Sequence, residues 1–259
     1  MPPNNATFFK TNVIKKIQAM KQLLFLLVAF AGTLSVAAQT KIINDANAEV
    51  RNVGSFHGIR VSTGIELQLT QSADEGVAVS AVSDEHRNNI RTEVENGILK
   101  IYYDQNKFWK GFNANGKKLK AYVSFKNIDK LEASSGGTVI INNAINVSSL
   151  NLDASSGGSV RGVINATTLN ADASSGAHLY VSGKVHNMTV DASSGAHFNG
   201  YDLVTETCNA EASSGAKVQV TINKELDANA SSGGGIQYKG SAVITNISTG
   251  SGGSVKKAS

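Results

Sequence analysis

Apolar and polar residues alternate along the second half of the chain in a unit that recurs every 18 to 21 residues. Each unit carries the tetrapeptide Ala-Ser-Ser-Gly or a degenerate form of it. The exact tetrapeptide occurs at Ala133–Gly136, Ala154–Gly157, Ala173–Gly176, Ala192–Gly195, Ala212–Gly215 and Ala230–Gly233, and a degenerate copy follows at Thr249–Gly252. The positions zero, two and four before the motif alanine are mostly apolar, which is the period of a strand with one buried face. The Ser-Ser-Gly that follows predicts a sharp turn, because glycine reaches positive φ without steric cost.

Equivalent apolar positions of successive units are expected to stack into buried columns. A coil of this length cannot bury its own apolar face, so it must pair with the next coil about 4.8 Å away. The expected core columns contain Leu150, Leu169, Met188 and Cys208 before the turn, and Val160, Leu179, Phe198 and Val218 after it. The only cysteine therefore takes the place of a core hydrophobe, and no internal disulfide is possible.

The predicted fold class is all-β: a parallel β-helix-like solenoid of about seven short rungs with an N-terminal β region that caps or flanks it. Residues 50–127 lack the repeat motif but alternate like strands, with Asn96-Gly97 as a hairpin turn. Residues 128–255 hold the repeats. We expect the two parts to form a single domain, 50–255, followed by a short tail, 256–259. Val61–Gly64 reads as an early, diverged copy of the rung corner.

The N-terminus is typical of a secretion signal over residues 1–38, with Met20 as a second possible start. Lysines precede the apolar run Leu23–Ala31, and small residues follow it, just before a short segment, 39–49. The alternative is a membrane anchor, but the run is shorter than the about 20 residues that a spanning helix needs. Cleavage would leave 24 − 4 = 20 basic against 20 acidic residues. We therefore expect neither an integral membrane protein after cleavage nor a nucleic-acid partner.

Three features of the N-terminal part, followed by serial Ala-Ser-Ser-Gly coils, resemble a known family. They are Phe56-x-x-Ile59-x-Val61, the Asn96-Gly97 hairpin, and the strand Ala121–Phe125. In this order they resemble the secreted bacterial domain called the putative auto-transporter adhesin, head GIN domain, common in the Bacteroidetes. The resemblance covers roughly residues 50–250. It implies a β-helix-like fold exported to the cell envelope, and it implies no established catalytic residues.

An acidic residue precedes the motif alanine in five copies: Glu132, Asp153, Asp172, Asp191 and Glu211. Strand parity points these side chains outward, and stacked carboxylates about 5 Å apart repel by about 1 kcal/mol in a water-like dielectric. A calcium ion, hydrogen bonds from the turns, or water alone would offset this repulsion. Asp153, Asp172 and Asp191 are the candidate metal ligands. However, the repeat lacks the Gly-Gly-x-Gly-x-Asp pattern of calcium-binding β-rolls, so we expect no cofactor.

One aperiodic segment, residues 104–120, carries the candidate ligand-binding side chains. They are Lys107, Phe108, Trp109, Lys110 and Phe112. Aromatic rings between basic residues suit stacking on sugars while an anion is held; the alternative is a long hairpin loop whose rings fold back onto the solenoid. His178 and His197 fall on adjacent rungs, but two histidines without a third ligand do not predict a metal site.

These observations predict an exported, non-catalytic interaction or adhesion module of the cell envelope, whose partner is an unknown envelope protein or glycan. One alternative is a polysaccharide-active β-helix enzyme that uses two of the stacked carboxylates as acid and base. The repeats vary by only three residues in length, which leaves no insertions to build the cleft that an enzyme needs. A purely structural envelope protein is the third possibility.

Overall fold

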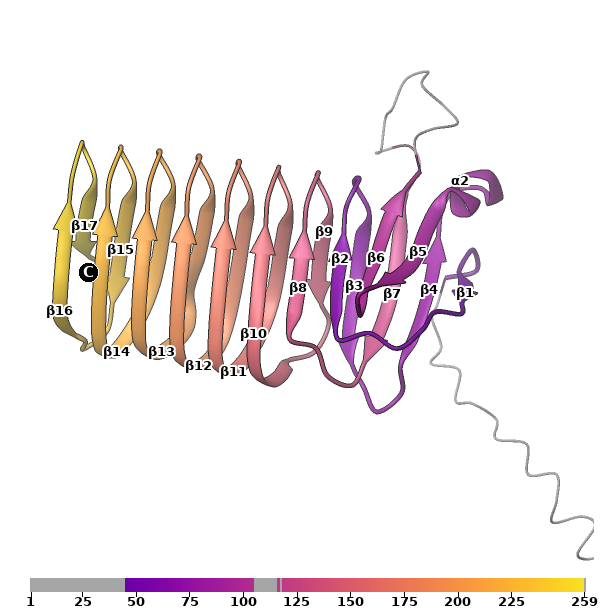
Figure 1. Ribbon diagram of the computed structural model, residues 1–259, viewed down its shortest axis with the longest axis horizontal. Coiled ribbons are helices and arrows are strands. Elements are labelled where there is room, and N and C mark those ends of the chain that lie inside the picture. Colours follow the sequence, from indigo (N-terminus) through magenta and orange to yellow (C-terminus); the bar gives the residue numbers. More distant parts are fainter. Residues whose placement is uncertain (1–44, 105–115, 117, 259) are drawn as a thin grey trace, which may run out of the picture. The chain divides into compact units, whose positions relative to one another are not determined.

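The computed structural model describes residues 45–104, 116 and 118–258. Over these residues the chain forms seventeen strands and one short helix. The strands build a two-sided solenoid, in which each rung rises on one side, turns sharply and descends on the other (Figure 1). The predicted all-β class, the parallel solenoid and the N-terminal β region are therefore confirmed.

The repeat part supplies most of the rungs. Its strands are β8 (Lys130–Ala133), β9 (Thr138–Ile141), β10 (Ile145–Ala154), β11 (Ser159–Ala173), β12 (His178–Ala192), β13 (His197–Ala212), β14 (Lys217–Ala230), β15 (Gly235–Lys239), β16 (Val243–Thr249) and β17 (Ser254–Lys257). Each of the long strands β11 to β14 descends from one corner, bends, and rises to the next corner. All of these strands pair with their neighbours in parallel.

The rungs lie in register, so equivalent residues are neighbours. Leu150, Leu169, Met188 and Cys208 lie opposite one another in turn, and so do Val160, Leu179, Phe198 and Val218. None of these eight side chains is more than 4% exposed. Full burial of such a side chain contributes about 1.5–3 kcal/mol, so the two columns form a continuous core along the solenoid.

Each corner is a tight turn with two successive residues of positive φ, at 49° for Ser156 and 71° for Gly157 in one copy. These are the φ values of a type I′ turn, in which both central residues have positive φ. The N–H of Gly158 closes the turn by donating to the carbonyl of Ser155 at 2.8 Å. The N–H of Gly157 donates to the carbonyl of Ser175 on the next corner at 3.0 Å. Because the other corners repeat this bond, the corners form a straight, hydrogen-bonded ridge.

The first rung comes from the N-terminal part, from β2 (Gly58–Val61) and β3 (Glu66–Gln71). These strands pair in parallel with β8 and β9, the first strands of the repeats. Between them, Thr63 and Gly64 have φ values of 59° and 70°, and Gly64 N–H donates to the carbonyl of Ser135 at 3.1 Å. The interpretation of this segment as a diverged corner is therefore confirmed.

Antiparallel strands cover the N-terminal end of the solenoid (Figure 1). The elements beyond the first rung are β1 (Glu49–Arg51), β4 (Gly76–Ser80), α2 (Asp84–Asn88), β5 (Ile90–Glu95), β6 (Ile98–Tyr103) and β7 (Lys120–Phe125). β6 and β7 add a last parallel layer to β2 and β3. β5 then pairs antiparallel with β6, and β4 pairs antiparallel with β7 and β1, so the ladder of parallel rungs ends here.

Candidate functional site

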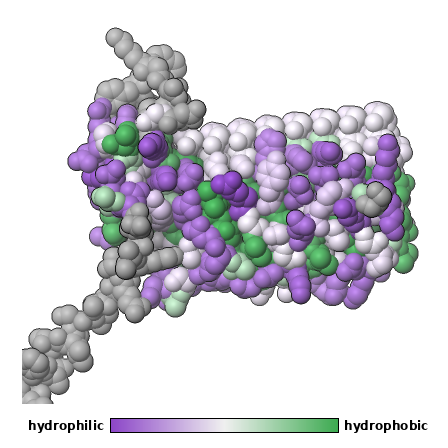
Figure 2. Space-filling view, turned by 180° about the vertical axis from the view of Figure 1, so that it is seen from behind, coloured by the Kyte–Doolittle hydropathy of each residue, from purple (hydrophilic) through white to green (hydrophobic). Residues whose placement is uncertain are grey.

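The two broad sides of the solenoid carry opposite charges. We call the side that leads up to the corners the acidic face; it consists of the three outward columns that begin at Ser149, Asn151 and Asp153. We call the opposite side the basic face. It consists of three outward columns, which begin at Ser159, Arg161 and Val163. The first two columns stay in register along the solenoid. Figure 2 shows the basic face below the pale ridge of the corners.

The two faces differ strongly in charge over these columns. From β10 onward the acidic face contains Asp153, Asp172, Asp191, Glu211, Glu225 and Asp227 and no Lys or Arg, while the same columns hold Glu132 and Lys130 one rung earlier. The basic face contains Arg161, Lys217, Lys239 and Lys256, and the carboxylate of Asp202 lies at its edge, at the register shift in β13. The outward positions of one set of rungs therefore present six carboxylates on one side and four cations on the other.

The predicted stack of carboxylates, which we call the carboxylate file, is in register along the solenoid. It runs from Glu132 through Asp153, Asp172 and Asp191 to Glu211. Burial raises the pKa of Asp153 first, and the neighbouring charge of Asp172 raises it further. Among the described residues, no cluster of three or more His, Cys, Asp or Glu side chains is arranged to hold a metal ion. The file thus consists of carboxylates on neighbouring strands, about 4.8 Å apart, and its described residues do not form a metal-binding cluster.

Two basic side chains form ion pairs with the first carboxylate of this file. Glu132, only 8% exposed, forms ion pairs with Arg60 and with Lys130, the latter at 2.6 Å. Burial by itself raises the pKa of Glu132, but the hydrogen bonds from Arg60 and Lys130 outweigh it, and the pKa lies below its usual value. Lys130 also lies 3.9 Å from Asp153. Repulsion along the file is thus offset at its N-terminal end by cations of the first rungs.

An aromatic cluster lies on the basic face. The ring of Tyr180, 44% exposed, stacks on His178 at 6.1 Å between centroids and an interplanar angle of 10°. His197 on the next rung lies edge-on to both, at 6.3 Å from His178 and 5.9 Å from Tyr180. The two predicted histidines are therefore adjacent, as part of a ring cluster.

A row of hydrogen-bonded side chains continues from this cluster. His197 Nε2 lies 3.0 Å from Gln219 Oε1, and Gln219 Nε2 donates to Gln237 Oε1 at 3.0 Å. Tyr201 donates from its hydroxyl to the same Gln237 oxygen at 3.2 Å, and the Lys239 ammonium lies 4.6 Å from the centroid of the Tyr201 ring. These contacts fix the side chains of three successive rungs, β13 to β15, on the basic face.

Other predicted residues lie in the core or outside the described residues. Cys208 is 4% exposed, and burial raises the pKa of its thiol to about 12, so it packs as a hydrophobe and is no nucleophile. Lys107, Phe108, Trp109, Lys110 and Phe112 lie outside the described residues, and so does the expected signal sequence. The predictions for these two segments stay predictions.

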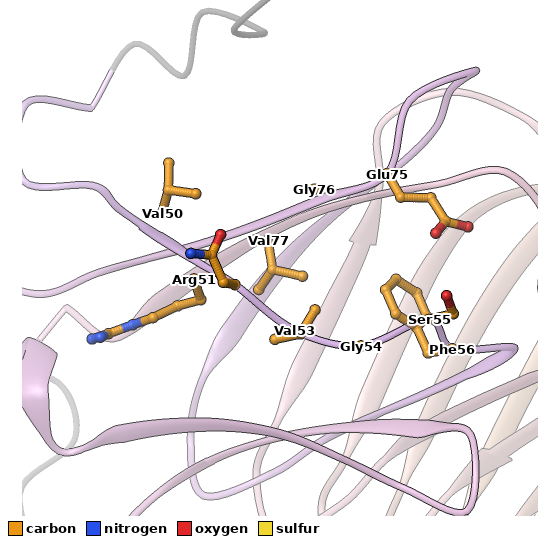
Figure 3. Close-up of a pocket in the computed structure, with 10 residues that line it drawn as sticks. Val50, Arg51, Val53, Gly54, Ser55, Phe56, Glu75, Gly76 and Val77 are labelled. Carbon is orange, nitrogen blue, oxygen red and sulfur yellow. The ribbon is translucent and has the colours of Figure 1, made fainter. Parts of the chain in front are cut away.

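A shallow hollow lies at the N-terminal end, between the segment after β1 and the start of β4 (Figure 3). Its volume is about 260 Å³. Arg51 and Glu75 lie at opposite ends of it, with Val53, Phe56 and Val77 between them. Glu75 is the one carboxylate among its lining residues, so the hollow lacks the carboxyl pair that glycoside cleavage needs.

Sequence reasoning found the acidic file and the two histidines but missed the row that contains Arg161, Tyr180, Asn199, Gln219 and Gln237. The signal was present, because these residues are two positions after the column of His178 and His197 and share its strand parity. The ion pair between Arg60 and Glu132 was missed for another reason. Its partners are 72 residues apart, and only the pairing of β2 with β8 brings them together.

Comparison with known proteins places this geometry in a family. Residues 55–242 match the family model described as putative auto-transporter adhesin, head GIN domain. No curated protein matches the sequence. Among the described residues, no helix is long and apolar enough to cross a membrane.

Solved structures share the fold at low sequence identity. A putative adhesin from Bacteroides fragilis superposes with a TM-score of 0.72 at 18% identity, over 82% of this chain and 96% of that one. A putative adhesin from Parabacteroides merdae gives 0.63 at 14% identity, over 82% and 95%. A putative lipid binding protein from Parabacteroides distasonis gives 0.60 at 24% identity, over 83% and 98%. These structures share the fold, and the match of residues 55–242 to the family model shows that the chain belongs to the family of putative auto-transporter adhesins with a head GIN domain.

Proposed function

We propose that the protein is an exported, non-catalytic adhesion module of the cell envelope that binds its partner through the broad faces of the solenoid. The observation that carries the proposal is the pair of extended faces with opposite charge and regularly spaced side chains. Membership of an adhesin family agrees with it. The signal-like sequence of residues 1–38 supports export.

The mechanism is multivalent contact. Equivalent side chains recur at the strand spacing of about 4.8 Å along each face, so one extended partner meets several copies of the same group. Individually weak contacts add up when the geometry lets them form together. Opposite charges on the two faces then select different partners, because electrostatic complementarity sets specificity and association rate more than affinity.

The aromatic and basic segment around Trp109 is a further proposed contact, supported by its composition alone. Replacing Trp109 by alanine is expected to weaken binding to envelope material, since ring stacking contributes about 1–3 kcal/mol per contact in comparable sites. Unchanged binding of Trp109→Ala, measured in the same assay as the parent protein, would remove this segment from the proposal.

A second candidate function is glycan cleavage by the stacked carboxylates. It is favoured by one observation: the pKa of Asp153 is raised beside Asp172, as in an acid–base pair whose environments differ. The even recurrence of the carboxylates on an open face counts against it, because catalysis needs a site that holds the substrate and excludes water.

The test is a binding screen of the purified protein against bacterial envelope fractions and immobilised glycans, with product analysis on each glycan. An adhesion module retains a ligand without changing it. A purely structural protein retains no ligand, which would contradict the proposal. Release of shorter sugars that stops in Asp153→Asn, while the variant keeps its thermal stability, would establish the enzyme instead.

A further inference from the structure

The basic face contains an unusual group of exposed rings. Tyr180, His178 and His197 come from two neighbouring rungs and contact one another on the water-facing side of the sheet. Tyr180 remains 44% exposed. A tyrosine offers a rigid apolar ring and a hydroxyl at a low cost in conformational entropy. Such a cluster suits a ligand that has both apolar faces and hydroxyl groups.

The row of Tyr180 continues with amides that are already held in place. In this row Asn199, Gln219 and Gln237 follow Tyr180 on successive rungs. The bonds from His197 to Gln219 and from Gln219 to Gln237 are both 3.0 Å long. An amide group has two donors and an oxygen with two lone pairs, so each member of the row keeps hydrogen-bonding capacity beyond these bonds. Pre-ordered side chains of this kind lose little entropy when they bind.

Cations flank the rings and amides. Arg161 precedes Tyr180 in its row, and Lys217 follows His197 in the adjacent row. Neither forms a salt bridge with a carboxylate in the part of the chain that the structure describes. Their strands, β11 and β14, are three strand spacings apart, about 14 Å. A ligand that covers the cluster therefore meets a positive charge at each end.

From these observations we propose that the basic face binds an acidic polysaccharide, centred on Tyr180. Sugar rings pack against Tyr180, hydroxyl groups bond to Asn199 and Gln219, and carboxylate or sulfate groups pair with Arg161 and Lys217. The inference rests on the proposed adhesive function and names the class of its ligand. The flat surface suits an extended chain that lies across several rungs.

Two other occupants of this face have the right charge. One is a second copy of the chain, whose acidic face would stack on the basic face. The other is single-stranded nucleic acid, which also combines anions with flat rings. The amide row favours the polysaccharide over both, because it matches a ligand rich in hydroxyl groups.

The experiment measures binding of the purified protein to fluorescent oligosaccharides of galacturonate, alginate, hyaluronan and chondroitin sulfate. Carboxyl-reduced oligogalacturonate is the neutral control of matched length, and a DNA oligonucleotide is the competing anion. We expect at least one acidic oligosaccharide to bind, with an affinity that falls as salt screens the charges. The neutral control and the DNA are expected to bind at least about tenfold more weakly, a difference of 1.4 kcal/mol.

Point variants then locate the site. Tyr180→Ala and Arg161→Ala are each expected to weaken binding about tenfold, or 1.4 kcal/mol, whereas Tyr180→Phe keeps the ring and most of the affinity. Two matched controls lie away from the basic face: Lys224→Ala removes an exposed base at the bend between rungs, and Thr189→Ala alters the acidic face. Both should bind like the parent protein. Circular dichroism of each variant shows whether it has folded.

Failure of this inference is distinct from failure of the proposed function. If envelope fractions bind but no acidic oligosaccharide does, or if Tyr180→Ala and Arg161→Ala bind normally, the adhesive function stands and the assignment of the basic face is wrong. Equal binding of DNA also overturns it. Sedimentation at low salt tests the second copy: self-association that disappears in Lys217→Glu would assign the face to the chain itself. If neither envelope material nor glycan binds, both proposals fall.

Discussion

The acidic and basic faces are built from the same rungs yet share almost no chemistry on their outer sides. Their inner sides are alike, since the columns of Leu169 and of Leu179 are both apolar and fully buried. Outward, one face carries six carboxylates and the other four cations. Alternate positions of each strand therefore have separate roles. Inward positions specify the solenoid, and outward positions are free to specify a partner.

Different interactions stabilise the outward side chains of the two faces. On the acidic face, the file of carboxylates is balanced by Arg60 and Lys130 at its N-terminal end. On the basic face, ring contacts and side-chain hydrogen bonds join neighbouring rungs from His178 to Gln237. We therefore expect charge changes to alter stability mainly on the acidic face and binding mainly on the basic face.

The largest expected effect comes from breaking the interior that both faces share. Phe198, which is fully buried, is replaced in Phe198→Ala. The cavity and the lost burial should lower the free energy of unfolding by about 3–5 kcal/mol. Thermal unfolding checks this, and Tyr180→Ala on the surface is the control, expected to lie within about 0.5 kcal/mol of the parent protein. Equal stability of the two variants would mean that Phe198 is not in the core.

The next effect concerns the cations that balance the acidic file. Arg60→Ala leaves the mostly buried Glu132 with Lys130 as its remaining ion-pair partner, and should cost about 1–2 kcal/mol at neutral pH. The pKa of Glu132 is lowered in the folded protein, so its contribution to stability is present above the unfolded pKa and is lost as the pH falls through the folded pKa. Unfolding of Arg60→Ala and the parent protein between pH 3 and 7 measures it; a constant difference over that range would refute the assignment.

A change of opposite sign is expected one rung further. The pKa of Asp153 is raised by burial and by Asp172, so its ionised form destabilises the folded state and stability grows as the pH falls through this pKa. Asp153→Asn should therefore stabilise the protein at neutral pH, by up to about 1 kcal/mol or 2–4 °C in melting temperature. The advantage should shrink under acidic conditions. A destabilised variant at neutral pH would show that the ion pair with Lys130, 3.9 Å away, outweighs the burial of this carboxylate.

The smallest expected change is at Cys208. Because burial raises the pKa of this thiol to about 12, it stays protonated and inaccessible, and iodoacetamide should not modify it in the native protein. The same reagent should react fully after unfolding in guanidinium. Rapid alkylation under native conditions would contradict the placement of Cys208 in the core column.

The sequence predicted those parts of the fold that repeat locally. The recurrence of Ala-Ser-Ser-Gly and the parity of its apolar neighbours are enough to assign the corners and the column of Leu150 and Leu169. The segment Val61–Gly64 was predicted as an early corner, but the partner of its strand was not, because about 70 residues separate β2 from β8. The parity of the column of Tyr180 was readable from the sequence, but the residue types in that column differ from rung to rung; only the contacts of Tyr180 with His178 and His197 distinguish the site.

A lysine footprint tests most directly whether the basic face is the one that binds. The protein is acetylated with and without the acidic oligosaccharide that binds it most tightly in the panel above, and modification is read by mass spectrometry. We predict protection of Lys217 and Lys239, while Lys224 at the bend between rungs reacts as in the free protein. Protection of Lys224, with Lys217 and Lys239 unchanged, would contradict the assignment of the basic face.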